Sequence, residues 1–307
     1  MKRRPRPLST AASMMAGLIA AALLAAAGCT RPQPPFAQLA GLLLDSQLDE
    51  ISGLAASHRH SDVLWLLDDG GNPARLFAVS RRGRKLATVA VEGVTKTDWE
   101  DLAAFDLDGR RYLLIADTGD NGGLRKTLQL HIVEEPARVE DGALRPAWSI
   151  AFRWPDGARD AEAVAVDAVR GEILLISKKR QPPELFVLPL QPASGLQTAR
   201  LIGRLAGVPQ ASAEDQRENA ALARRRSQIT AAAVSPDRRT LAVLTYHDLL
   251  LYPRRGEESW ARAVTHKPKS HELPWLPQPE ALDWARNGRA LYATGEFAPA
   301  PLVYLQP

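Results

Sequence analysis

An acidic or amide residue followed by small and apolar residues recurs five times along the chain. The recurrences start at Glu50, Glu100, Glu162, Gln228 and Glu280, with spacings of 50, 62, 66 and 52 residues. Carboxylates that are brought together repel one another, so some of them must take up a proton, pair with a cation or bind a metal. If the fold gathers these residues, the repeat predicts acid–base chemistry or cation binding.

Each unit is followed by short apolar stretches rich in β-branched and aromatic residues, which predict strands. We expect one strand per unit at 63–67, 112–116, 173–177, 241–245 and 290–294, the next at 76–79, 128–133, 185–190, 249–252 and 302–305, and an outer one at 86–91, 148–152, 199–205 and 261–265. With the small-residue strand that opens each unit, this pattern indicates an all-β fold, a β-propeller of five blades, with six blades as the alternative. A β-sandwich also has short strands, but it does not explain the repeated acidic unit.

Two segments depart from the simple repeat. The fifth unit lacks an outer strand, and residues 38–48 are expected to supply it, so that N-terminal and C-terminal strands pair and close the ring. Residues 212–226 are rich in helix formers, with acids early and arginines late, and Ser212 is a suitable N-cap. We expect a helical insertion between blades three and four, either as a rim or lid of a site or as a solvated surface helix.

The topology of a propeller predicts which residues meet. The first strand of each blade starts at the face where the second strand ends, so openers and closers converge there. The closers are Asp68-Asp69, the segment 117–121, Lys178-Lys179, Tyr246-His247 and Glu296. We therefore expect a ligand-binding, acidic channel mouth formed by Glu50, Glu100, Glu162, Gln228, Glu280, Lys178 and His247.

A metal is one means of neutralising such a mouth. Calcium takes six to eight oxygen ligands, and Asp117, Asp120 and Asn121 place three oxygen-bearing side chains around a glycine. These three residues, with Glu50, are the candidate ligands for Ca²⁺ or another divalent cation. The alternative is that Asp and Asn simply stabilise a turn at the end of a strand.

The N-terminus has the features of a signal peptide over residues 1–28. A basic head of Lys2, Arg3, Arg4 and Arg6 precedes an apolar run from Met14 to Ala27. The end of this run, Ala26-Ala27-Gly28-Cys29, resembles a bacterial lipobox, which implies cleavage before Cys29 and lipidation of that cysteine. The absence of Asp after the cysteine implies, by the same resemblance, an outer-membrane anchor facing the periplasm. Ordinary cleavage nearby is the alternative.

Residues 29–35 then form a proline-rich linker, and 36–307 the propeller domain. Because Cys29 is the only cysteine, no disulfide can stabilise the domain. The leader holds four of the 39 basic residues and none of the 35 acidic ones, so the remaining chain has 35 of each. A balanced charge without a basic stripe argues against nucleic-acid binding.

Three motifs carry a family resemblance: Glu50-Ile-Ser-Gly-Leu-Ala, Asp98-Trp-Glu-Asp-Leu-Ala103 and Ile115-Ala-Asp-Thr-Gly-Asp-Asn121, followed by Arg125 and Val133-Glu-Glu-Pro136. They resemble uncharacterised exported bacterial β-propeller lipoproteins, which are distantly similar to phytase-like esterase and gluconolactonase-like propellers. The resemblance implies that Glu50 matches a glutamate that holds a divalent metal. Gln228 and Lys178 stand where later ligands of that family are expected.

Two functions remain open at this point. The first is a membrane-anchored propeller that binds a small-molecule ligand or an envelope protein at its acidic mouth. The second is a divalent-metal-dependent hydrolase of a lactone, ester, phosphoester or glycoside, in which Glu100 or Glu162 acts as the base. The sequence has no nucleophile-elbow motif and no phosphate-binding glycine loop.

Overall fold

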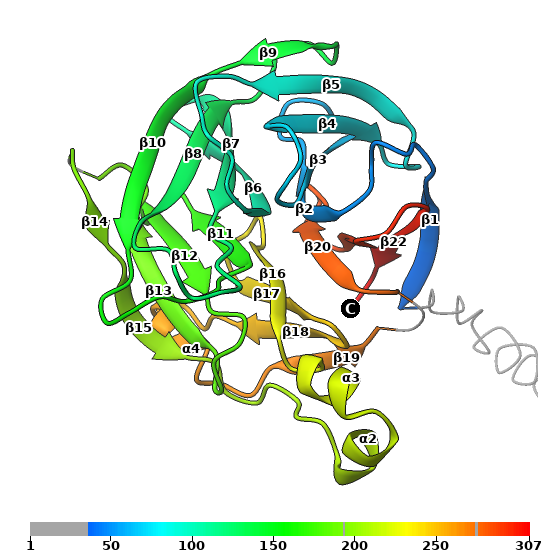
Figure 1. The fold of residues 1–307 in the computed structure, drawn as a ribbon, viewed down its shortest axis with the longest axis vertical. Coiled ribbons are helices and arrows are strands. Elements are labelled where there is room, and N and C mark those ends of the chain that lie inside the picture. The colour runs from blue at the N-terminus through cyan, green and yellow to red at the C-terminus, as the bar shows by residue number, and fades with distance from the viewer. Residues whose placement is uncertain (1–35, 193, 274–275) are drawn as a thin grey trace, which may run out of the picture. The chain divides into compact units, whose positions relative to one another are not determined.

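Five β-sheets surround a common axis and form the blades of a β-propeller (Figure 1). This computed structural model describes residues 36–192, 194–273 and 276–307. The predicted signal peptide, Cys29 and the linker to residue 35 lie outside the described residues. The all-β fold with five blades is confirmed.

The strands have the same order from the axis outward in every blade. The innermost strands are β2 (Ile51–Ala56), β6 (Trp99–Leu107), β11 (Ala163–Asp167), β16 (Ile229–Val234) and β20 (Pro279–Trp284). The second strands are β3 (Val63–Asp68), β7 (Arg110–Asp117), β12 (Glu172–Ile176), β17 (Thr240–Thr245) and β21 (Leu291–Gly295). The third strands are β4 (Arg75–Ser80), β8 (Leu128–Glu134), β13 (Glu184–Pro189), β18 (Asp248–Pro253) and β22 (Ala300–Leu305). The fourth strands are β5 (Lys85–Val91), β10 (Pro146–Arg153), β15 (Arg200–Arg204), β19 (Lys269–Glu272) and β1 (Ala37–Leu43).

Blades one and two each carry one additional strand at the rim. The short strand β9 (Gly142–Leu144) pairs in parallel with β5, and β14 (Gln197–Thr198) pairs in parallel with β10. Each of these strands lies in the segment between the third and fourth strands of the next blade, so each one links two neighbouring blades.

The ring is closed by the predicted pairing of the two ends of the domain. Strand β1 runs antiparallel to β22, with Ala37 opposite Leu305 and Leu43 opposite Ala300. Blade five therefore takes three strands from the C-terminal part of the chain and one from the N-terminal part. The range Phe36–Pro307 forms one compact unit that contains all five blades and this closure.

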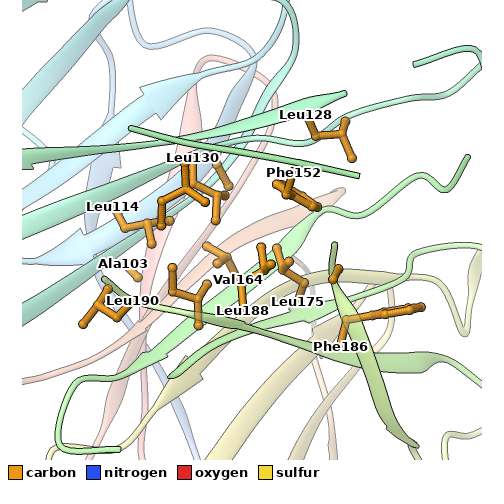
Figure 2. Close-up of a cluster of buried hydrophobic side chains, with 14 of the residues drawn as sticks. Ala103, Leu114, Leu128, Leu130, Phe152, Val164, Leu175, Phe186, Leu188 and Leu190 are labelled. Atoms are coloured by element: carbon orange, nitrogen blue, oxygen red, sulfur yellow. The ribbon is translucent and has the colours of Figure 1, made fainter. Parts of the chain in front are cut away.

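Apolar side chains fill the space between each pair of neighbouring blades. Figure 2 shows the cluster between blades two and three, where Leu130 and Phe152 face Val164 and Leu188. Four further clusters occupy the other junctions around the ring. Burial of apolar surface contributes about 25 cal/mol per Å², so the stability of every blade depends on both of its neighbours.

The innermost strands lie so close together that only small residues fit at several positions. A methyl group on Gly53 of β2 would lie 2.8 Å from the backbone nitrogen of Leu102 in β6. Strand β16 carries three consecutive alanines, Ala231 to Ala233. The small residues of the repeated unit therefore allow the innermost strands to pack closely around the axis.

Two aspartates, the buried Asp101 and the partly buried Asp283, join innermost strands of different blades. Asp101 on β6 accepts hydrogen bonds from the backbone nitrogens of Val164 on β11 (2.8 Å) and Ala232 on β16 (3.4 Å). Asp283 on β20 accepts one from Ala56 on β2 (2.8 Å). Burial raises the pKa of Asp101 well above its usual range and raises the pKa of Asp283 to about 7, despite these donors.

The predicted helical insertion is present as two short helices that project from the rim of the ring (Figure 1). They are α2 (Ala213–Glu218) and α3 (Ala220–Arg225). Ser212 caps α2 in a capping box with Asp215, and Asn219 separates the two helices and caps α3. None of the described helices is long and apolar enough to cross a membrane.

One strand prediction was wrong. Residues 261–265 do not form the outer strand of blade four, because helix α4 (Trp260–Ala263) starts there from the N-cap Ser259. Trp260, Ala263 and Val264 recur at helical spacing and are buried together against blade three. The outer strand is β19, later in the chain and rich in polar residues.

Asp283 gives the domain a pH-dependent term in its stability. The pKa of Asp283 is about 7 in the folded protein, above the unfolded value of 3.8. Its contribution to the unfolding free energy is therefore full below pH 3.8 and is lost as the pH rises through 7. We expect the unfolding free energy of the wild type, relative to Asp283→Asn, to fall by roughly 2–3 kcal/mol between pH 5 and pH 8. Urea unfolding at the two pH values measures this difference, and an equal difference at both would contradict it.

Candidate functional site

The innermost strands reach one face of the ring in a common register. A backbone nitrogen in the closing segment of the second strand donates to the carbonyl of a residue just before the innermost strand, for example Asp69 to Glu50 (2.8 Å) and Lys178 to Asp160 (3.0 Å). The residues at this place, which we call the entry positions, are Glu50, Asp98, Asp160, Gln228 and Gln278.

A second set of residues lies two places further along each strand. These bulge positions are Ser52, Glu100, Glu162, Thr230 and Glu280. In four of the five blades the strand pairing shifts register at this residue. A bulge of this kind turns a side chain away from the regular alternation. The alignment of Glu50 and Gln228 with the glutamates of the other blades was therefore wrong by two residues.

A cavity of about 300 Å³, which we call the mouth, lies where these positions converge. From the bulge positions it receives Ser52, Glu100, Glu162 and Glu280, and from the entry positions Gln228 and Gln278. The closing segments and the insertion supply Asp69, Asn121, Lys178, Lys179, Arg225, Tyr246 and Glu296. Of the seven residues expected to bind a ligand, the mouth thus brings together Glu100, Glu162, Gln228, Glu280 and Lys178.

Glu50 and His247, which the sequence also assigned to this site, do not line the mouth. The exposed Glu50 accepts a hydrogen bond from Asn72 (2.9 Å). His247 lies near Asp248 and Glu272 and lines a neighbouring hollow. Glu50 stands two residues before the bulge residue Ser52, and His247 follows Tyr246 in the turn between β17 and β18.

The three expected metal ligands in 117–121 separate in the structure. Asp117 accepts hydrogen bonds from the backbone nitrogens of Thr97 (2.9 Å) and Asp98 (3.1 Å) and pairs with Arg125. Asp120 accepts from backbone nitrogens within its own turn. These two carboxylates stabilise the loop, as the alternative interpretation of this segment has it. Asn121 reaches the mouth, where its Oδ1 accepts from Lys179 (2.7 Å).

Two groups of three carboxylates gather at the mouth, and these buried acidic clusters can bind a metal ion. One group is Asp69, Asp98 and Glu100, and the other is Glu100, Asp160 and Glu162. Within each group, one oxygen from every residue lies within 4.8 Å of the others. Glu100 belongs to both groups. Sequence reasoning missed Asp98 and Asp160 as ligands, although both stand two residues before a glutamate of the repeat, which is the signal for the entry positions.

The pKa values of this half of the mouth are raised. Burial, and then the charges of Glu162 and Asp69, raise the pKa of Glu100 well above its usual range. Burial and the adjacent Asp69 carboxyl raise the pKa of Asp98 to about 7. The carboxylates therefore share protons near neutral pH unless a cation takes the place of those protons.

The other half of the mouth contains its own cation. Lys178 is buried and pairs with Glu162, and its ammonium lies 5.2 Å from the centre of the Tyr246 ring. Burial alone would lower the pKa of Lys178, but the charges of Glu162 and Glu280 outweigh that effect and raise it. Tyr246 donates to Glu280 (2.7 Å), whose pKa is raised to about 7 mainly by burial.

Two buried oxygen atoms at the mouth lack a hydrogen-bond partner among the described residues. They are Oε2 of Glu162 and Oε2 of Glu280, on side chains that belong to residues only 3% and 6% exposed. Unpaired buried acceptors of this kind are costly to a fold. Their presence at the edge of a cavity indicates space for a cation or a hydrogen-bond donor.

Gly119 makes room for the acidic groups. A methyl group at this residue would lie 2.2 Å from Glu100 Oε1 and 2.3 Å from Asp98 Oδ2. The two carboxylates thus pack directly against the glycine backbone of the closing segment. At Gly122, three residues later, a methyl group would meet only Leu124, at 3.4 Å.

No family model matches the chain, and no curated protein matches it. Among solved structures, the "Crystal structure of Nidogen/Laminin Complex" is similar, with 14% sequence identity, a TM-score of 0.47, and coverage of 82% of this chain and 74% of that chain. A similarity at this level says nothing about the ligand of the present chain.

Replacement of Lys178 should lower the stability of the domain, because the buried acids lose their cation. We expect Lys178→Met to lower the unfolding free energy by about 3–5 kcal/mol at pH 8, because the buried Glu162 carboxyl loses its cation and must either stay charged without a partner or hold a proton well above its usual pH range. The double variant Lys178→Met/Glu162→Gln should recover most of that loss, as urea unfolding would show. Equal stability of the single and double variants would contradict the ion pair.

A methyl group at residue 119 should disturb the mouth locally. We expect Gly119→Ala to cost about 1–3 kcal/mol of unfolding free energy, since Asp98 and Glu100 must move out of their packed positions. Gly122→Ala, the matched control, should change the stability by less than about 0.5 kcal/mol. If thermal or urea unfolding finds the same effect for both variants, the carboxylates do not lie against Gly119.

Proposed function

We propose that this protein is an exported, lipid-anchored propeller that binds a divalent cation at its mouth, with Ca²⁺ as the first candidate, and through that site a ligand. The fold fits a ligand-binding or protein-binding role, because propellers are rigid platforms whose inner strands converge at one face. The observation that carries the proposal is the position of Glu100, which belongs to both groups of three carboxylates.

The donor set fits a hard cation. All the charged groups of the two clusters are carboxylates, and calcium prefers oxygen ligands and tolerates irregular arrangements of them. The unpaired oxygen of Glu162 offers a further ligand atom next to the cluster. A bound divalent cation would displace the shared protons of Asp98 and Glu100 and offset the repulsion among the acids.

The calcium ligands of this proposal differ from those suggested by the sequence. Asp69, Asp98, Glu100, Asp160 and Glu162 replace Asp117 and Asp120, whose oxygens are engaged by backbone donors in their loop. Asn121 stays available at the rim of the mouth, next to Lys179.

The envelope location belongs to the same proposal. It rests on the basic and apolar leader, the lipobox-like sequence before Cys29 and the proline-rich stretch that follows. In this arrangement the lipid on Cys29 holds the domain at a membrane, facing the periplasm, and the mouth is free to bind a small molecule or an envelope protein.

Calcium titration of the domain Phe36–Pro307 by calorimetry tests the cation site, with magnesium titrated for comparison. We expect saturable binding of Ca²⁺ and a higher melting temperature on addition of the ion, because the ion binds only the folded state. Glu100→Gln should abolish both effects, since it removes the carboxylate common to the two clusters.

Glu50→Gln is the matched control for this experiment. It makes the same change at the residue that the sequence aligned with Glu100 but that lies outside the mouth, so calcium affinity should stay within about twofold of the wild type. Loss of binding in Glu50→Gln with retention in Glu100→Gln would reverse the assignment. Absence of calcium binding in the wild type would refute the cation site itself.

A further inference from the structure

A second hollow, of about 360 Å³, lies beside the mouth. Its walls come from the helical insertion, which supplies Leu222 and Ala223 of α3, and from the turn between β17 and β18, which supplies Tyr246 and His247. Most of the surface that faces this hollow is carbon. The second hollow thus differs from the mouth, whose surface is mainly polar.

The two hollows adjoin each other. Arg225, Tyr246 and Gln278 line both of them. Each volume lies at the low end of the range for small-molecule sites, roughly 300–1,000 Å³, and together they fall well within it. A single ligand can therefore place one end in the polar mouth and the other in the second hollow.

Leu222 supports an apolar occupant of the second hollow. This residue is 65% exposed, although leucine is normally buried, and it stands on the helix that forms the wall. Burial of such a side chain against a hydrocarbon or aromatic group contributes a favourable free energy on binding.

The charged groups where the two hollows meet indicate the chemistry of the other end of the ligand. The lysines and the other arginine around the two hollows are paired: Lys178 with Glu162, Lys179 with Asp160, and Arg226 with Asp215. Arg225 alone among these lysines and arginines has no ion pair or side-chain hydrogen bond in the described part of the chain. A guanidinium in this position is suited to a carboxylate or another oxyanion.

Glu218 restricts how an anionic ligand is oriented. It is an exposed acidic group of the second hollow without an ion pair among the described residues, so an anion at that end would be repelled. The anionic end must then lie at the junction with the mouth, next to Arg225. A divalent cation among the carboxylates would make the mouth accept an anion there.

We propose that the mouth and the second hollow together bind one anionic amphiphile, with its oxyanion paired to Arg225 and its apolar body against Leu222. This inference rests on the proposed cation site, because the mouth without a bound cation repels anions. It names the class of ligand: a small acid with a hydrocarbon or aromatic body.

Calorimetry of the domain Phe36–Pro307 with saturating Ca²⁺ tests this inference, with octanoate, acetate and octylammonium as probes. We expect octanoate to bind at least tenfold more tightly than acetate and than octylammonium. Leu222→Glu should remove the preference for octanoate over acetate. Arg225→Gln should weaken octanoate at least fivefold, whereas Arg224→Gln, an adjacent exposed arginine that lines neither hollow, should leave it unchanged.

Calcium binding measured alone in each variant separates this inference from the proposed function. If Leu222→Glu binds Ca²⁺ normally and loses the octanoate preference, the amphiphile site is supported. If Ca²⁺ binds but octanoate and acetate bind equally, or octylammonium binds more tightly, the anionic amphiphile is refuted while the cation site stands. If Ca²⁺ does not bind, the proposed function fails, and the anionic amphiphile site fails with it, because the mouth would then repel the anionic end.

Discussion

The innermost strands of the propeller have no further strand to pair with on the side of the axis, and the fold depends on how that edge is satisfied. Backbone nitrogens buried there need acceptors, because an unpaired buried donor costs as much as a lost hydrogen bond. Asp101 and Asp283 provide such acceptors, and each joins strands of different blades. The two aspartates thus hold the centre of the ring together while the apolar clusters between blades hold its periphery.

The same crowding that requires small residues at the centre produces the chemistry of the mouth. Bulges at the start of the innermost strands turn Glu100 and Glu280 toward one cavity, and Glu162 enters it from just before β11. Burial raises the pKa of all three carboxyls. Packed acids of this kind oppose folding, and only Lys178 lies among them as a buried cation. Clusters that weaken a fold in this way are found most often where a protein binds or reacts.

The architecture was predictable from the sequence because strand alternation and a repeated unit survive in each blade. Trp260, Ala263 and Val264 were assigned to a strand because a short apolar run suits a strand and a helix equally. The helix forms because it buries these three side chains against blade three. At the site, Glu100, Glu162 and Glu280 were placed correctly in space. Glu50 was not, because in blade one the bulge position holds Ser52 and the glutamate stands two residues earlier, at the entry position. Arg225 stands in an insertion outside the repeat, so no internal comparison pointed to it.

The closure of the ring by β1 and β22 has a mechanical meaning. Strand β1 is made first and finds its partner β22 only after the rest of the domain has been made, so blade five stays open until that point of translation. Strand β1 is also the segment that continues toward Cys29. A force applied through a tether there would act along the length of β1 and load all its hydrogen bonds to β22 at once, in shear. In the proposed lipid-anchored form, the hydrogen bonds between β1 and β22 that keep the ring closed would therefore also be the ones that resist a pull on the tether.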